Sequence, residues 1–80
     1  MIATAYVLIK VAAGKARQVY DKLSKLKGVQ HVDAITGPYD IISIVQGTDF
    51  STIGRMVVDQ IQTIEGITDT ITCNVISFEV

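Results

Sequence analysis

The sequence is poor in several residue types on which known classes of protein depend. Its 80 residues include one cysteine, one histidine and no tryptophan. A single cysteine excludes an internal disulfide and a cysteine-based zinc site, and it is typical of a reducing compartment. The start of the sequence does not resemble a signal peptide. We therefore expect a cytoplasmic protein.

Long hydrophobic runs and charge of one sign are also scarce. The longest apolar stretches, such as residues 5–9, fall far short of the roughly 20 residues that span a bilayer. Seven basic residues balance eight acidic ones, and the basic residues are scattered through the first sixty positions instead of forming a stripe. Nucleic-acid-binding domains gather such residues on one face. We expect neither a membrane segment nor direct contact with nucleic acid.

Hydrophobic residues, by contrast, are abundant for a chain this short. They make up 49% of the sequence, and a length of 80 residues allows one domain, expected to cover residues 1–80. A lone domain of this size buries only roughly 60 to 65% of the surface that its unfolded chain exposes. The surplus predicts an interface between copies of the chain.

Residue periodicity predicts six elements in the order βαββαβ. The expected elements are strands at 3–11, 29–36, 40–46 and 68–79, and helices at 15–26 and from 49 to about 64. Gly28 and Gly66 end the helices, and the four residues 26–29 recur in similar form as 64–67. Helix-Gly-Val is also a common helix exit, but a duplicated βαβ unit explains the echo directly. It predicts an α+β, ferredoxin-like domain with a four-stranded antiparallel sheet in the order 4-1-3-2 and both helices on one face.

The strands at 3–11 and 40–46 are apolar on both alternating faces. In the first strand, Val7 and Ile9 lie on one face, and Tyr6 and Leu8 lie on the other. Two helices cover only one face of a four-stranded sheet, so an isolated domain should have a polar second face. The pattern therefore predicts that a second sheet packs there, giving a dimeric α/β sandwich or barrel.

Groups for catalysis are few. His31 lies in the expected edge strand and Cys73 in another strand, where a cysteine is most often a small buried hydrophobe, and nothing places the two within hydrogen-bond reach. The sequence contains neither a glycine-rich phosphate loop nor a cluster with metal-ligand spacing. We expect no enzyme activity, no cofactor and no metal ion.

The segment Thr36-Gly37-Pro38-Tyr39-Asp40 is suited to binding a small zwitterion. Gly37 allows a ligand to approach the backbone, and Pro38 restricts the loop before binding. Tyr39 offers a wall with a polar tip, and Asp40 accepts hydrogen bonds from an ammonium group. Gly-Pro and Asp are also ordinary turn residues, which leaves a purely structural turn as the alternative.

The order of these motifs resembles the effector-binding domain of the Lrp/AsnC transcription regulators, also called the RAM domain. The motifs are Leu26-x-Gly28-Val29, Thr36-Gly37-x-Tyr39-Asp40, Asp49, and Ile64-x-Gly66-Ile67-x-x-Thr70-x-Thr72. The resemblance covers essentially the whole chain. It implies a stand-alone regulatory domain without the helix-turn-helix of the family, acting as an oligomeric amino acid sensor that does not bind DNA by itself.

The resemblance also implies an assembly and a site. Dimers form sheet to sheet and assemble into an octamer-like ring of four or more dimers, with an amino acid effector bound between dimers; full-length Lrp/AsnC relatives are further expected partners. The implied ligand-binding positions are Ala34, Thr36, Gly37, Tyr39, Asp40 and Phe50, with Thr70, Thr72, Cys73, Asn74 and Val75 from a neighbouring subunit.

The same resemblance suggests a role for each group. Asp40 would bind the ammonium group, the turn N–H groups would bind the carboxylate, and Phe50 with Cys73 or Val75 would surround the ligand side chain. Two other classes of function stay open from the residues alone. One is a small cofactor-free enzyme of the dimeric α/β barrel type, and the other is a purely structural assembly domain.

Overall fold

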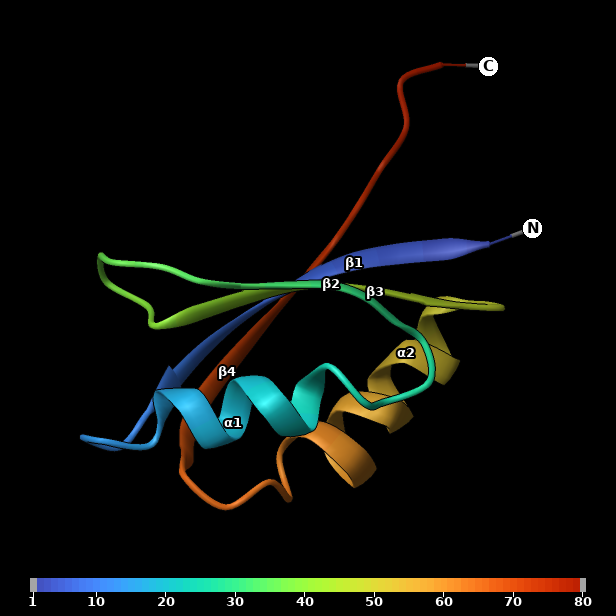
Figure 1. Cartoon of the computed structure of the whole chain (residues 1–80). Helices are drawn as coiled ribbons and strands as arrows, with labels where there is room; N and C mark the ends of the chain where they lie inside the picture. Colours follow the sequence, from blue (N-terminus) through green and yellow to red (C-terminus); the bar gives the residue numbers. More distant parts are fainter. Residues whose placement is uncertain (1, 80) are drawn as a thin grey trace.

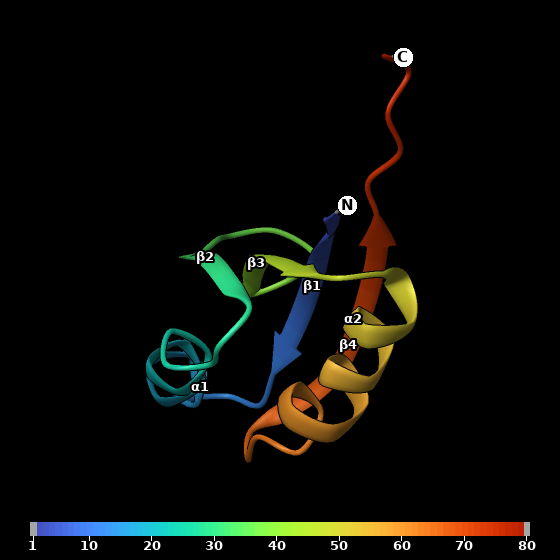
Figure 2. The same ribbon diagram turned by 90° about the vertical axis from the view of Figure 1, so that its right-hand side faces the viewer.

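The computed structural model describes residues 2–79 and has the predicted order of strands and helices (Figure 1). Its elements are β1 (Ala3–Val11), α1 (Ala16–Leu23), β2 (Val29–Ala34), β3 (Ile41–Gly47), α2 (Phe50–Met56), the π-helix η1 (Val57–Ile61) and β4 (Ile67–Asn74). The strands form one antiparallel sheet in the order β2-β3-β1-β4, which is the predicted order read from the other edge. Both helices lie on the same side of this sheet (Figures 1 and 2).

The core lies between the sheet and the helices. Ala5, Val7 and Ile9 of β1 are fully buried, because alternate side chains of a strand point to the same face. Val19 and Leu23 of α1 pack against these residues. From the second helix, the buried residues of the same core are Ile53, Val57 and Ile61. The helical periodicity of the sequence therefore identified the buried face of both helices correctly.

The second helix begins as predicted and then widens. The Asp49 carboxylate accepts a hydrogen bond of 2.7 Å from the Thr52 N–H, which satisfies a donor that the first helical turn leaves unpaired. Further along, the Gln62 N–H donates to the Val57 carbonyl at 2.8 Å, a bond that spans five residues and defines η1. Single π turns of this kind often occur at functional sites.

The ends of several elements differ from the sequence-based expectation. The strand β2 ends at Ala34 and not at residue 36, and the second helix, with η1, ends at Ile61 and not near residue 64. The helix α1 ends at Leu23 and not at residue 26. After Leu23 the hydrogen bonds span three residues instead of four, as in the bond from the Leu26 N–H to the Leu23 carbonyl. The last strand ends at Asn74 and not at residue 79. The Val75 N–H still donates to the Thr4 carbonyl at 2.9 Å, but β1 begins at Ala3, so residues 77–79 have no strand beside them.

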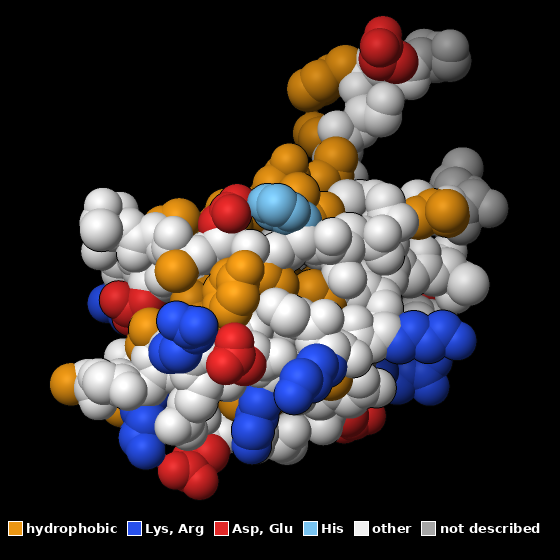
Figure 3. Space-filling view, viewed as in Figure 1, with side chains coloured by type: hydrophobic (Ala, Val, Ile, Leu, Met, Phe, Trp, Pro, Cys, Tyr) orange, Lys and Arg blue, Asp and Glu red, His pale blue; other side chains and the backbone are white. Residues whose placement is uncertain are grey.

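The segment after β4 projects from the domain (Figures 1 and 2). Ile76 is 70% exposed and Phe78 is 90% exposed, and hydrophobic side chains are visible along this segment in Figure 3. Large apolar side chains exposed to this extent are suited to packing against another molecule.

The face of the sheet that the helices leave uncovered is apolar, as predicted. One row across it contains Ile42, Leu8 and Ile71, and the next contains Ile44, Tyr6 and Cys73. Tyr6 and Ile71 are each 42% exposed. The expectation that Cys73 is buried was wrong, because its position on β4 points it to this uncovered face.

Within residues 2–79, no helix is long and apolar enough to cross a bilayer. His31 is exposed on the edge strand β2, as predicted, and its Nε2 lies 2.9 Å from the Asp33 carboxylate.

The glycines of the repeated segment give a test of the fold. Gly66 has a φ of +103°, and a Cβ there would lie 2.9 Å from the Lys15 Cβ. We expect Gly66→Ala to lower the free energy of unfolding by about 3 kcal/mol, through left-handed strain together with overpacking. Gly14 is the matched control, because its φ is +78° and nothing lies within 4 Å of an added Cβ. Gly14→Ala should cost about 1 kcal/mol. Equal losses in urea denaturation would contradict the close approach of α1 to Gly66.

Candidate functional site

The predicted site residues form two groups that lie apart in one chain. The turn between β2 and β3 carries the first group, and Ile41 directly after it pairs with Ile9. Gly47, shortly before Phe50, pairs with Ala3 at the other end of β1. At about 3.3 Å per residue, the turn and Phe50 are separated by roughly 20 Å along β3. A single chain therefore does not bring all the predicted residues together.

The turn is fastened to the end of β1. The Asp40 N–H donates to the Ile9 carbonyl, and the Ile35 N–H donates to the Asp40 carbonyl, both at 2.9 Å. The Asp40 carboxylate oxygen Oδ2 also accepts a 2.9 Å hydrogen bond from the Val11 N–H. Asp40 thus has a structural role that the sequence did not reveal, since the pairing of the turn with β1 links positions 29 residues apart.

Tyr39 and Gly37 have the surroundings that a binding turn requires. The Lys10 ammonium lies 5.6 Å from the centroid of the Tyr39 ring, within the range of a cation–π contact. Gly37 has a φ of +142° and open space around the position of a Cβ. Ala34 and Thr36 are exposed beside it. This end of the sheet is therefore accessible to a ligand or to a neighbouring molecule.

The second group divides between the two faces of β4. Thr70, Thr72 and Asn74 pair with the buried residues of β1, so they lie on the face that carries the helices, whereas Cys73 lies on the uncovered face. Two of them line a groove of about 290 Å³ between β4 and the second helix. Its lining includes Phe50, Val58, Gln62, Thr72 and Asn74. The structure thus brings Phe50 together with Thr72 and Asn74, while Cys73 lies outside this groove.

Val75 lies with Phe50 in a second, larger groove of about 680 Å³ at the start of the projecting segment. Phe50 is 44% exposed and Val75 is 41% exposed, so both apolar side chains face an opening. Phe50 is common to both grooves. It is therefore the predicted residue best placed to contact the apolar part of a ligand.

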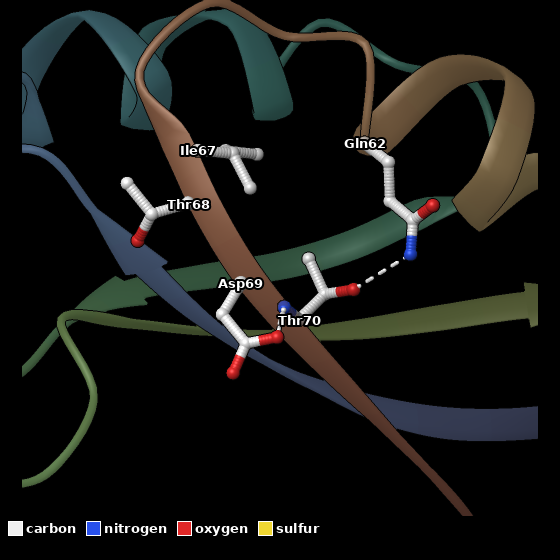
Figure 4. Close-up of a pocket in the computed structure, with 5 residues that line it drawn as sticks. All are labelled: Gln62, Ile67, Thr68, Asp69 and Thr70. Carbon is white, nitrogen blue, oxygen red and sulfur yellow. Dashed lines mark hydrogen bonds between the residues drawn. The ribbon is translucent and has the colours of Figure 1, made fainter.

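A third groove, of about 250 Å³, lies beside the first residues of β4 (Figure 4). It is lined by Gln62, Ile67, Thr68, Asp69 and Thr70. The Gln62 amide Nε2 donates to the Thr70 hydroxyl at 2.9 Å, so η1 and β4 are joined across it. Of the five, only Thr70 was predicted from the sequence. No sequence motif pointed to Gln62 or Asp69 as site residues, although Asp69 directly precedes Thr70.

The start of the second helix has a distinct electrostatic character. Hydrogen bonds from the backbone and side chain of Thr52 hold the pKa of the Asp49 carboxyl below its usual value, with a smaller contribution from the charge of Arg55. This carboxylate fixes the first turn of α2, and the next residue is Phe50. The orientation of Phe50 therefore depends on the cap.

Catalytic and metal chemistry find little support in the described part of the chain. His31 and Cys73 lie on β2 and β4, the opposite edges of the sheet, so about three strand spacings of 4.8 Å separate them. No group of three or more His, Cys, Asp and Glu side chains within residues 2–79 is placed to hold a metal ion.

The fold and the grooves define a small ferredoxin-like binding domain with an uncovered sheet face. Residues 4–78 match the model of the Lrp/AsnC ligand binding domain, and the chain belongs to this family. An uncharacterized HTH-type transcriptional regulator of Pyrococcus abyssi is 32% identical over 79 residues, which cover 95% of this chain and 51% of the relative. The chain spans about half the length, or less, of the curated relatives it matches. These relatives are named as transcriptional regulators and not as enzymes.

Solved structures share the fold. The crystal structure of FFRP-DM1 has a TM-score of 0.88 and 30% identity, and the match covers 92% of this chain and 99% of that chain. A transcriptional regulator of Neisseria meningitidis in complex with L-Met has a TM-score of 0.84 and 22% identity, with 95% of this chain and 51% of that chain covered. The predicted ferredoxin-like fold and the resemblance to the Lrp/AsnC family are confirmed.

The cap at Asp49 leads to a prediction about pH. Because the folded-state pKa of Asp49 lies below the usual aspartate value of 3.8, the stabilisation is present above that pH and is lost as the pH falls through the folded-state pKa. We expect Asp49→Ala to lower the thermal midpoint at pH 7, and we expect its difference from the unaltered protein to shrink below pH 3.8. Asp59→Ala is the control, since the Asp59 carboxylate accepts no hydrogen bond in the described structure. A difference that persists unchanged in acid would contradict the cap.

Proposed function

We propose that this domain is an amino-acid-binding regulatory domain that senses its ligand as an oligomer. The observation that carries the proposal is that the turn and Phe50 lie at opposite ends of β3, while Phe50 shares a groove with Thr72 and Asn74 of β4. Each group is accessible, and neither encloses a ligand alone. A site completed between two copies explains both facts, because the turn of one copy can close the grooves beside β4 of another.

The proposed site has one set of residues from each copy. The turn supplies backbone N–H groups around Gly37 and an aromatic wall, and the β4 side supplies hydroxyl and amide groups with an apolar wall from Phe50. The proposed contact residues are Ala34, Thr36, Gly37, Tyr39 and Asp40 from one copy, and Phe50, Thr70, Thr72, Cys73, Asn74 and Val75 from its neighbour. The Neisseria regulator in complex with L-Met, which has the same fold, supports an amino acid as the ligand.

Self-association is part of the proposal. The uncovered sheet face is apolar, and burying it would remove Tyr6, Leu8 and Ile71 from water at roughly 25 cal/mol for each Å² of apolar surface. We propose sheet-to-sheet dimers that assemble further into a ring, and that full-length relatives join such assemblies. The scatter of the seven basic residues along the sequence supports a domain that does not contact DNA itself. The proposed location is the cytoplasm.

A thermal-shift screen against the twenty amino acids tests the ligand. A ligand selective for the folded state raises stability by about 2.7 kcal/mol at a hundredfold excess over Kd, and we expect a rise of several degrees with one or a few amino acids. Thr72→Val should reduce this rise, because it removes a hydroxyl from the groove without changing the side-chain shape. Thr63→Val is the matched control, since the Thr63 hydroxyl, just after η1, donates only to the Asp59 carbonyl of η1. A folded, oligomeric protein that no amino acid stabilises would favour the structural assembly domain.

A charge on the uncovered face tests self-association. We expect Tyr6→Glu to raise the dimer dissociation constant by at least about a hundredfold, because burying an unpaired carboxylate costs about 3–5 kcal/mol. Gln18→Glu introduces the same charge at an exposed position of α1 and should leave the dimer intact. Analytical ultracentrifugation across a concentration series measures both constants. Dimerisation of Tyr6→Glu at the original affinity would show that another surface holds the copies together.

A further inference from the structure

A fourth groove lies at the end of the sheet where β2 begins and β3 ends. It has a volume of about 510 Å³, and its lining includes Lys27, Gly28, Gln46, Thr48, Arg55 and Met56. Lys27 and Arg55 are exposed, and neither belongs to an ion pair found within residues 2–79. Asp59 also lines the groove, so the lining carries two cations and one carboxylate. The groove therefore has a net positive charge.

The inner part of this groove is apolar. Met56 is partly buried and packs against the hydrophobic core. Its Sδ would lie 3.1 Å from a Cβ at Gly28, where φ is +95°, so a residue with a side chain would not fit at Gly28 without strain. A methionine is unbranched and adapts its shape, and its sulfur makes favourable contacts with aromatic rings. The groove is thus suited to an aromatic side chain next to a negative charge.

The projecting segment after β4, residues 75–79, has this complementary character. Phe78 is 90% exposed and Ile76 is 70% exposed, and Glu79 directly follows Phe78. The Val75 N–H bonds to β1, and the further hydrogen bonds of the described part of the segment join Ser77 and Glu79 to each other. Its apolar side chains and its carboxylate are therefore available to another molecule.

The groove of the same chain does not receive this segment. None of the described residues 75–79 lines it. The segment projects on the side of the sheet away from the helices (Figures 1 and 2), whereas Arg55 and Met56 of α2 line the groove. The segment points instead to the side of the uncovered sheet face, where a second copy is proposed to pack. A second copy is therefore the occupant that the geometry favours.

The strand order brings the segment to the groove of that second copy. The edges of the sheet are β2 and β4, and they run in opposite directions. When two sheets close into a barrel about a two-fold axis parallel to the strands, β4 of one copy lies antiparallel beside β2 of the other. The end of β4 then adjoins the start of β2. Residues after Asn74 consequently pass Lys27 and Gly28 of the second copy.

Charge distinguishes this arrangement from the other way of closing the barrel. A two-fold axis across the strands would place β4 beside β4 of the second copy, again antiparallel. The segment would then pass the start of β4, where Asp69 is exposed. Glu79 and Asp69 carry like charges, whose juxtaposition disfavours association. The groove beside β2 has the opposite sign to Glu79 and is the favoured neighbour.

We propose that residues 75–79 of one copy bind in the groove between Lys27, Arg55 and Met56 of a second copy. Phe78 lies against Met56, and Glu79 lies between the two cations. Two-fold symmetry gives two such contacts in each dimer. The inference rests on the proposed self-association and names the surface that receives the projecting segment.

Photo-cross-linking of the whole chain tests the contact directly. p-Benzoylphenylalanine takes the place of Phe78, and a mixture of unlabelled and isotopically labelled protein distinguishes cross-links between copies from those within one copy. Mass spectrometry should find cross-links between copies at Met56 or at residues 27–28. Cross-links confined to one chain, or between copies at residues 67–71, would overturn the proposal.

The dimer dissociation constant, measured by analytical ultracentrifugation, tests the two halves of the contact. We expect Phe78→Ala to raise it by at least about tenfold, because an apolar side chain is lost at both contacts. Arg55→Glu and Glu79→Arg should each raise it by up to about tenfold at low salt, since attraction becomes repulsion at two exposed pairs. The chain carrying both changes should return to within about threefold of the unaltered chain.

Lys25→Glu is the matched control for the charge reversals. Lys25 is an exposed residue just before Lys27 and does not line the groove, so its reversal should leave the dissociation constant within about threefold of the original. Circular dichroism checks that each variant is folded. A loss with Lys25→Glu as large as that with Arg55→Glu would show that only the overall charge matters, and the proposed contact would be wrong.

Other results separate this inference from the proposed self-association. If the unaltered chain dimerises and Phe78→Ala, Arg55→Glu and Glu79→Arg all dimerise at the same affinity, the segment does not bind in this groove and the sheet-to-sheet dimer stands. If Phe78→Ala weakens the dimer but the reversed pair shows no recovery, the segment binds elsewhere and the groove assignment is wrong. If the unaltered chain is folded but monomeric at every concentration, both proposals fail.

Discussion

Strand β1 hydrogen-bonds to β3 along one edge and to β4 along the other, while its alternate side chains are fully buried beneath the helices. The nine residues of β1 therefore take part in two strand pairings and in the core. The turn before β3 is anchored to the C-terminal end of this strand through Asp40, and the segment after β4 leaves it at Thr4. The turn and the start of the projecting segment are thus placed at the two ends of β1.

This arrangement has a consequence for association. A strand that is central in the sheet has one face covered by helices, and here its other face is apolar as well. A domain of 80 residues has little core with which to offset the loss of chain entropy on folding. Covering the second face with another sheet adds buried apolar surface without adding chain length. In the proposed assembly, the same contact would bring several copies of the turn and of the β4 grooves together, which would link stability to ligand binding.

Asp40 is engaged within the fold. Its carboxylate accepts the Val11 N–H at 2.9 Å, and its own N–H donates to the Ile9 carbonyl at 2.9 Å. A ligand that drew this carboxylate away would leave the Val11 N–H without its acceptor. The hydrogen bonds of the folded chain, and not the sequence pattern alone, therefore define the structural role of Asp40.

The sequence by itself determined the element order and the buried faces, because alternation in a strand and the 3.6-residue period of a helix are local properties of the chain. It predicted the strand order through the repeat of residues 26–29 as 64–67, which indicates a duplicated βαβ unit. Gly28, Gly66 and the cap at Asp49 were also readable, since each acts on its own neighbours. Only the tertiary structure decided that β4 stops at Asn74, that Cys73 faces outward, that Asp40 is engaged by Val11, and that Gln62 and Asp69 share a groove. Most of these features depend on which residues become neighbours across strands or between a helix and the sheet, and that pairing is fixed by register and packing over distances that no local pattern records.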